Sequence, residues 1–125
     1  MRALFDTNIL IDYLNGLDSA KIELARYKQP MISQITWIEI MVGTNSNDER
    51  AIRSFLFGFM QVSIDTAVAE CAVSLRQQYR LGLPDAIVWA SAQVQNALLV
   101  TRDIKDFRAD NPGVRVPYQV AKLAP

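Results

Sequence analysis

Short apolar runs alternate along this chain with longer segments in which apolar residues recur every third or fourth position. The short runs end at polar or turn-forming residues, a pattern that predicts β-strands, whereas the longer periodic segments predict helices. Strands are expected over residues 2–6, 31–34, 60–64, 98–101 and 114–116. Helices are expected over about 8–14, 18–28, 35–42, 48–57, 65–80, 85–96 and 104–108.

This alternation predicts the α/β fold class, with a mainly parallel central sheet that is flanked by helices on both faces. The chain has 125 residues, the size of one domain, so residues 1–125 are expected to form a single unit. Half of the residues are hydrophobic and 21% are charged, a composition typical of globular proteins.

A single carboxylate interrupts the most apolar helical segment, I-T-W-I-E-I-M-V-G at 35–43. Helical winding places Ile35, Ile38 and Val42 on one face and leaves a narrow polar strip around Glu39. A helix this apolar is expected to be mostly covered by protein. Because burial of an unpaired carboxylate is costly, Glu39 either reaches solvent or an arginine, or points into a cleft where a cation offsets its charge.

The absence of histidine excludes more reaction types than any other feature of the composition. It removes Ser-His-Asp and Cys-His catalysis, histidine general bases and histidine metal sites. Cys71 is the only cysteine, which excludes an intrachain disulfide and a cysteine-based zinc site. Carboxylates are therefore the expected means of any chemistry, helped by lysine, arginine, hydroxyl groups or a metal ion.

Membrane association is not expected, because no apolar run approaches the roughly 18 residues that cross a bilayer. The N-terminal MRALFD meets an acid at position 6 and is too short for a secretion signal, so a cytoplasmic location is expected. The 13 basic and 13 acidic residues balance, and this net charge gives no support for nucleic-acid binding.

Four acids from separate segments are expected to meet at one edge of the sheet. Asp6 ends the first strand, Glu39 follows the second, Asp85 opens a helix and Asp103 follows the L-L-V-T strand. In open α/β sheets, sites form outside the carboxyl ends of the strands. Crowded carboxylates stay ionised only around a divalent cation, and oxygen ligands of this kind suit Mg²⁺ or Mn²⁺.

Each acid also has a purely structural explanation. Asp6 could bond the amides of the helix that follows it, Asp85 could interact with a helix dipole, and Asp103 could be a turn residue. These alternatives weaken when the acids are considered together with Glu39 in its apolar helix.

Four sequence blocks resemble the PIN-domain family in their order and spacing. They are L-F-D-T-N at 4–8, Glu39 in its apolar helix, P-D-A-I-V-W-A-S-A at 84–92 and L-L-V-T-R-D-I-K-D-F at 98–107. Within the family, the chain is most similar to VapC-type toxins of bacterial toxin–antitoxin pairs. It departs from the commoner A-A-T-A pattern by placing Trp89 in the third block, where we expect a change in packing or in a contact surface.

The resemblance implies a metal-dependent endoribonuclease with Mg²⁺ or Mn²⁺ as cofactor, in which the metal activates water for attack on RNA phosphorus. The metal-binding and catalytic residues would be Asp6, Glu39, Asp85 and Asp103. Residues that orient the site or contact the substrate would be Thr7, Asn8, Thr101 and Arg102. Many relatives carry Asn at the position of Asp103, so the fourth acid is either Asp103 or Asp106. The products would carry a 5′-phosphate and a 3′-hydroxyl.

The implied partners are RNA as substrate, a cognate antitoxin, a second copy of the chain in a homodimer, and DNA through the antitoxin in a higher assembly. Large apolar side chains exceed the obvious needs of a small core. Most are expected inside it, and the remainder could form a homodimer face and a groove for an antitoxin segment: Trp37, Met41, Phe55, Phe57, Phe59 and Trp89. Basic residues of the second half could form a rim for RNA: Arg76, Arg80, Arg102, Lys105, Arg108 and Arg115.

Three alternatives stay open at this point. A phosphorylatable receiver module is also α/β and binds Mg²⁺ after its first strand, but it uses a pair of acids there and leaves Glu39 unexplained. A PIN-like domain could bind RNA or protein without cutting. A PIN nuclease could process RNA without any antitoxin.

Overall fold

The computed structural model describes residues 1–120, so the last part of the expected domain, residues 121–125, lies outside the described residues. Five short strands form one sheet in the order β3-β2-β1-β4-β5, and every neighbouring pair is parallel. The strands are β1 (Ala3–Phe5), β2 (Met31–Ser33), β3 (Met60–Val62), β4 (Leu98–Val100) and β5 (Val114–Arg115). The predicted α/β class with a parallel sheet is confirmed.

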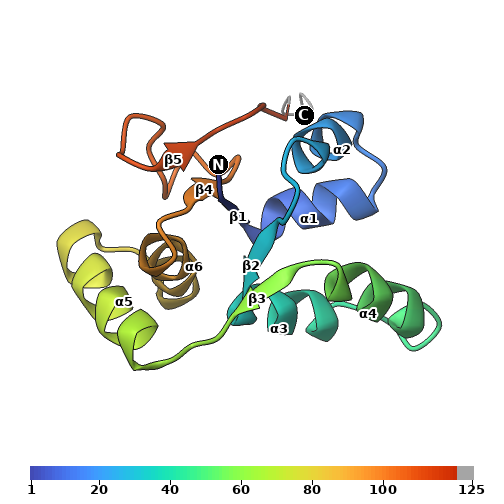
Figure 1. Ribbon diagram of the computed structural model, residues 1–125, viewed down its shortest axis with the longest axis horizontal. Helices are drawn as coiled ribbons and strands as arrows, with labels where there is room; N and C mark the ends of the chain where they lie inside the picture. The colour runs from blue at the N-terminus through green and yellow to red at the C-terminus, as the bar shows by residue number, and fades with distance from the viewer. Residues whose placement is uncertain (121–125) are drawn as a thin grey trace, which may run out of the picture.

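Helices cover both faces of the sheet, as Figure 1 shows. The helices within residues 1–120 are α1 (Thr7–Leu14), α2 (Asp18–Ala25), α3 (Gln34–Val42), α4 (Glu49–Phe57), α5 (Thr66–Tyr79) and α6 (Leu83–Val94). Helices α1 to α4 lie on one face, and α5 and α6 lie together on the other. Helix α6 begins at Leu83 with Pro84 in its first turn, where the missing amide of proline costs nothing.

Strand β1 contributes to both hydrophobic clusters. Leu4 belongs to the cluster beneath α5 and α6, whereas Ala3 and Phe5 belong to the cluster beneath α1 to α4. Successive side chains of a strand point to opposite faces, so a central strand with both faces covered is apolar throughout. This burial explains why the strands appear in the sequence as continuous apolar runs.

The strand order places the carboxyl ends of β1 and β4 side by side. The chain builds outward from β1 through β2 to β3, and then crosses back to β4 on the other side of β1. The register pairs Phe5 with Val100, so Asp6 and Thr101 follow paired residues at the same edge. Ligand sites of open parallel sheets form where the strand order reverses in this way.

Helix α3 is more exposed than the sequence analysis predicted. Thr36 and Ile40 are buried, but Ile38 is exposed and Val42 is 81% exposed. The helix packs against α1, α4, α6 and β2, and Gln34, Ile38, Glu39 and Val42 stay exposed. The expectation that protein covers most of this helix is therefore wrong.

The helix expected over 104–108 is also wrong, because this segment forms a turn. The amide of Phe107 donates to the carbonyl of Asp103 at 3.0 Å, and the Asp103 carboxylate accepts the amides of Lys105 and Asp106 at 3.1 and 3.2 Å. These bonds satisfy the donors of one turn locally. Phe107 then packs in the core, so the segment does not continue as a helix.

No helix within residues 1–120 is both long enough and apolar enough to cross a membrane.

Candidate active site

Asp6 lies at the centre of the candidate site, directly after β1. It is 6% exposed and is the N-cap residue of α1, where its Oδ1 accepts the amide of Thr7 at 2.8 Å. Its Oδ2 accepts the hydroxyl of Thr101 at 2.8 Å and the side-chain amide of Asn8 at 3.3 Å. The capping role considered from the sequence is therefore present, and both carboxylate oxygens are held in fixed positions.

The structure also brings Asp85, Asp103 and Asp106 together. One carboxylate oxygen of each lies within 4.8 Å of the others. Asp85 comes from the first turn of α6, and the other two come from the turn after β4. Because the Asp103 carboxylate bonds the amides of its own turn, Asp106 folds back beside Asp85. Both candidates for the fourth acid therefore lie beside Asp85.

Burial and crowding raise the pKa values of two of these acids. Burial is the main cause that raises the pKa of Asp6 to about 6, against the hydrogen bonds from Thr101 and Thr7 that lower it. Burial and the neighbouring charges of Asp6, Asp106 and Asp103 raise the pKa of Asp85 to about 7. A cation among these groups would offset the repulsion and keep them ionised at neutral pH. Carboxylate oxygens are ligands that fit Mg²⁺ or Mn²⁺.

Glu39 lies apart from the three clustered acids, beside Thr7. The Thr7 hydroxyl donates to Oε1 of Glu39 at 2.8 Å and lies 3.0 Å from the hydroxyl of Thr36. Glu39 is exposed, which agrees with the interpretation in which it reaches solvent. Its charge still acts on Asp6, whose pKa it helps to raise.

A hollow of about 280 Å³ opens beside Glu39, between α1, α3 and α4. Its apolar lining includes Ile11, Leu14, Ile40 and Ile52. Glu39 thus lies at a cleft, as one of the two sequence interpretations expected, although it is not buried in it.

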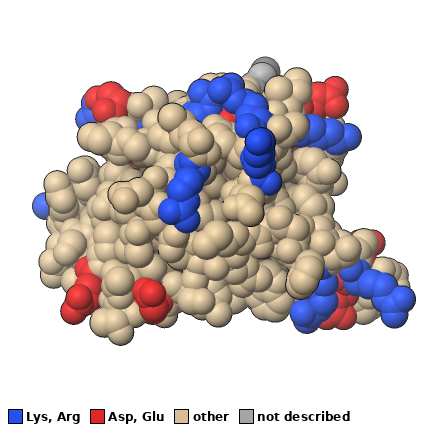
Figure 2. All heavy atoms as spheres, viewed as in Figure 1, with Lys and Arg blue, Asp and Glu red and all other residues tan. Residues whose placement is uncertain are grey.

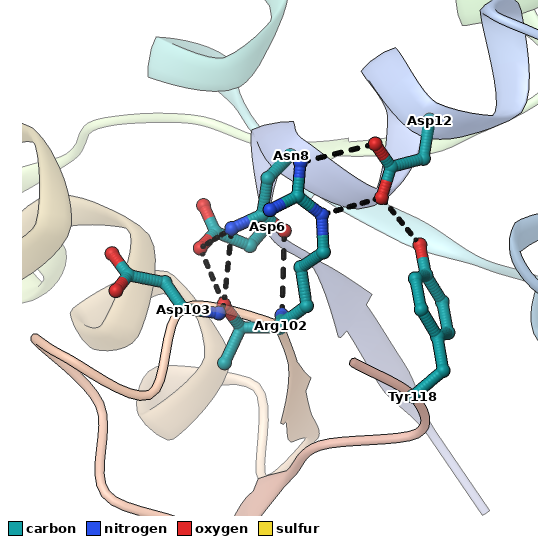
Figure 3. A network of polar contacts seen from close by, with 7 residues as sticks. Asp6, Asn8, Asp12, Arg102, Asp103 and Tyr118 are labelled. Atoms are coloured by element: carbon teal, nitrogen blue, oxygen red, sulfur yellow. Dashed lines mark hydrogen bonds and ion pairs between the residues drawn. The ribbon is translucent and has the colours of Figure 1, made fainter. Parts of the chain in front are cut away.

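Arg102 points away from the acids, although it directly precedes Asp103. Its guanidinium binds both carboxylate oxygens of Asp12 on α1, with Nη2 at 3.1 Å from Oδ1. Tyr118 donates its hydroxyl to the same carboxylate at 2.8 Å. Figure 3 shows this pair on the side of the loop opposite the Asp103 carboxylate. Asp12 therefore holds the Arg102 guanidinium in this conformation, and contact of Arg102 with the substrate stays a prediction.

Sequence reasoning missed Asp12 and Tyr118 altogether. A signal for Asp12 was available, because it lies four residues after Asn8 and so on the same face of an otherwise apolar helix. Tyr118 had no comparable signal, since it lies in a segment without regular structure after β5.

The expected basic rim is only partly present. Arg115 binds Glu23 at 2.7 and 3.0 Å, and Arg108 binds Asp110 at 3.2 Å. On the face drawn in Figure 2, basic side chains lie in separate groups with uncharged surface between them. With Arg102 also paired, half of the predicted basic residues carry an intramolecular acid partner.

The bulky aromatic residue of the third block is part of the core. Trp89 is 2% exposed and contacts Tyr79 and Phe107, with ring centroids 4.9 and 5.8 Å apart. Trp89 therefore belongs to the core rather than to a contact surface.

Comparison with known proteins places the chain in a family. The family model described as the PIN domain matches residues 3–110. The chain belongs to the PIN-domain family. The resemblance noted from the sequence blocks is thereby confirmed.

Individual relatives of this PIN-domain protein come from toxin–antitoxin systems. A solved toxin–antitoxin complex from Klebsiella pneumoniae contains a chain with 47% identity and a TM-score of 0.89, covering 94% of this protein and 99% of that chain. Ribonuclease VapC10 from Mycobacterium tuberculosis is 29% identical over 83% of this protein and 84% of the relative. VapBC2 from Rickettsia felis, bound to a promoter DNA fragment, has 23% identity and a TM-score of 0.76, covers 91% and 96% of the two chains, and supports the fold alone.

Proposed function

We propose that this PIN-domain protein is an endoribonuclease that depends on Mg²⁺ or Mn²⁺ and serves as the toxin of a toxin–antitoxin pair. The observation that carries the proposal is the group of acids at the carboxyl ends of β1 and β4. Asp85, Asp103 and Asp106 share one small region, and the pKa values of Asp6 and Asp85 are raised by burial and mutual repulsion. Such an arrangement is suited to a divalent cation.

In this proposal Asp6, Asp85 and either Asp103 or Asp106 hold the metal, and Glu39 contributes from the cleft side. When bound, the ion would lower the pKa of water and neutralise charge that develops on phosphate oxygens. The chain itself orients the ligands, because Thr101 and Asn8 donate to Asp6 and Thr7 donates to Glu39. Thr7, Asn8 and Thr101 are therefore proposed to orient the carboxylates rather than to bind RNA directly.

Cleavage of total RNA tests the activity. Wild type, Asp6→Asn and Asp18→Asn are incubated with Mg²⁺ or Mn²⁺, with a chelator control. Asp18 is the matched control because it is an exposed acid in the first turn of α2. We expect cleavage by wild type and Asp18→Asn, leaving a 5′-phosphate and a 3′-hydroxyl, and a rate at least roughly 100-fold lower for Asp6→Asn. Cleavage that survives chelation, or equal cleavage by Asp6→Asn, contradicts the proposal.

The toxin role is supported by the 47% identical chain, which comes from a toxin–antitoxin complex. We propose an antitoxin partner, a homodimer and, through the antitoxin, an assembly on DNA. Apolar side chains left open to solvent, such as Val42 and the 91% exposed Phe57, are available for such contacts.

The partner proposal is tested by inspecting the neighbouring reading frames for a small protein, and by co-expression with any that is found, followed by size-exclusion chromatography with light scattering. A stable complex in which RNA cleavage is inhibited supports a toxin. Cleavage that is unaffected by the neighbouring protein favours an RNA-processing nuclease without an antitoxin. RNA binding by wild type without any cleavage favours a non-catalytic module. The extent of the nuclease domain over residues 1–125 and the cytoplasmic location stay predictions.

A further inference from the structure

A partly buried ion pair ties the loop after β4 to helix α1. Asp12 is 8% exposed, and its two carboxylate oxygens receive Nε and Nη2 of Arg102. Tyr118 completes the group by donating its hydroxyl to Oδ2 of Asp12 at 2.8 Å. Burial and the charge of Asp12 raise the pKa of Tyr118, so its hydroxyl stays protonated and remains a donor.

The same loop carries the acid site on its other side. Thr101, the residue before Arg102, donates to Asp6, and Asp103, the residue after it, faces Asp85. The amide of Arg102 donates to Oδ1 of Asn8 at 3.4 Å, and Nδ2 of Asn8 donates to Oδ2 of Asp6 at 3.3 Å. Figure 3 shows the Arg102 guanidinium and the Asp103 carboxylate on opposite sides of this loop.

This arrangement keeps the Arg102 guanidinium away from the crowded carboxylates of the candidate site. Arg102 is adjacent in sequence to Asp103, and the charge of Asp103 already acts on its guanidinium. A guanidinium without a partner would be attracted to crowded carboxylates, where it would form charge-assisted hydrogen bonds and compete with a divalent ion. The bidentate, buried carboxylate of Asp12 holds it elsewhere.

We propose that Asp12 and Tyr118 are positioning residues that sequester Arg102, so that its guanidinium does not occupy the acid site. This inference rests on the proposed function, because it concerns the metal affinity of that site. Asp12 acts through Arg102 and Tyr118 acts through Asp12, so neither contacts the reacting groups.

The protein contains a matched control for this chemistry. Glu23 is buried, binds Arg115 through both carboxylate oxygens and accepts the hydroxyl of Tyr27 at 3.1 Å. This second acid–arginine–tyrosine group repeats the composition of the first. Arg115 follows Val114 in β5, whereas Arg102 adjoins an acid of the site. Disruption of the Glu23–Arg115 pair tests the general effect of breaking an ion pair of this kind.

The experiment measures Mn²⁺ binding to the full chain by calorimetry and by electron paramagnetic resonance, without RNA. Asp12→Asn should weaken Mn²⁺ binding by about tenfold, the effect of roughly one charge-assisted contact made by the released Arg102. Tyr118→Phe should weaken binding by a smaller factor. The double variant Asp12→Asn/Arg102→Gln should return the affinity to within about threefold of wild type, because the competing cation is gone.

Glu23→Gln and Tyr27→Phe should leave Mn²⁺ affinity within about twofold of wild type, and thermal unfolding of metal-free protein confirms that each variant is folded. The proposal is overturned if the double variant binds Mn²⁺ no more tightly than Asp12→Asn, since a merely structural ion pair predicts that result. It is also overturned if Asp12→Asn and Tyr118→Phe both bind as wild type does. Mn²⁺ binding by wild type without RNA cleavage overturns only the proposed function, whereas absence of Mn²⁺ binding by wild type overturns both.

Discussion

The hydroxyl of Thr101 donates to Oδ2 of Asp6 at 2.8 Å and joins the ends of two neighbouring strands, although the residues are 95 positions apart in the sequence. Thr101 is fully buried, and the bond lowers the pKa of an acid whose burial raises it. The hydroxyl therefore stabilises the ionised form of Asp6 that a metal ligand needs.

Replacement of Thr101 should affect both stability and activity. Thr101→Val removes the donor and leaves a buried carboxylate with one partner fewer, at an expected cost of about 1–3 kcal/mol in the free energy of unfolding near neutral pH. Thr101→Ser keeps a hydroxyl and should retain most of that stability. Urea unfolding of both variants checks the difference. Equal stability of the Val and Ser variants would show that the bond contributes nothing.

The acids should also make the metal-free protein less stable as pH rises. The pKa of Asp6 is raised from 3.8 to about 6 and that of Asp85 to about 7, so the folded state binds more protons than the unfolded state between about pH 4 and 7. The contribution of these groups to the stability of the folded protein is fully present below their pKa in the unfolded state. It is lost as pH rises through their pKa in the folded state. For Asp6 alone the shift corresponds to roughly 3 kcal/mol.

Asp85→Asn isolates this effect from the other titrating groups. In the presence of a chelator, the variant should be more stable than wild type at about pH 7.5, above the titration of Asp85. The difference should disappear at about pH 4, where Asp85 is protonated in the folded state. Glu70→Gln neutralises an exposed acid on α5 and serves as the control. A stability difference of the same size at both pH values contradicts the assigned cause.

Glu39 should matter for metal affinity and hardly at all for folding. Its carboxylate is exposed, so Glu39→Gln should change the free energy of unfolding by no more than about 0.5 kcal/mol. The amide can still accept the Thr7 hydroxyl, but it lacks the charge that acts on Asp6. We expect a higher half-saturating Mn²⁺ concentration in RNA cleavage and a smaller loss of rate than in Asp6→Asn. An unchanged Mn²⁺ dependence would remove Glu39 from the proposed ligands.

Trp89 should be one of the residues on which stability depends most. Trp89→Ala removes a buried ring that contacts Tyr79 and Phe107, and should cost about 3–5 kcal/mol. Phe57→Ala truncates an aromatic ring that is exposed and should cost less than about 0.5 kcal/mol. Denaturant unfolding of the two variants measures the contrast. Similar costs at the two positions would contradict the packing described for α6.

The sequence allowed good prediction of the elements whose pattern follows from local periodicity and burial. Residues 98–100 are apolar throughout because β4 is covered on both faces, and the run therefore marks a strand. The positions of Asp6 and Asp103 at strand ends predicted their proximity for the same reason: parallel strands bring their carboxyl ends to one edge.

Features that depend on distant neighbours could not be predicted in this way. The periodicity of α3 describes which residues share a face, but not whether another element covers that face, and so the exposure of Val42 was missed. The partner of Arg102 is Asp12, 90 residues away, and no local pattern distinguishes a paired arginine from a free one. The turn after Asp103 depends on side-chain bonds to its own amides, which compete with the helix that its composition favours.

The most direct test of the proposed metal site is anomalous diffraction from crystals of the wild-type protein soaked in Mn²⁺. The account predicts an anomalous peak bonded to carboxylate oxygens of Asp6 and Asp85 and of Asp103 or Asp106. The absence of an anomalous peak among these acids after soaking, or peaks bonded only to other groups, would contradict the proposed metal site.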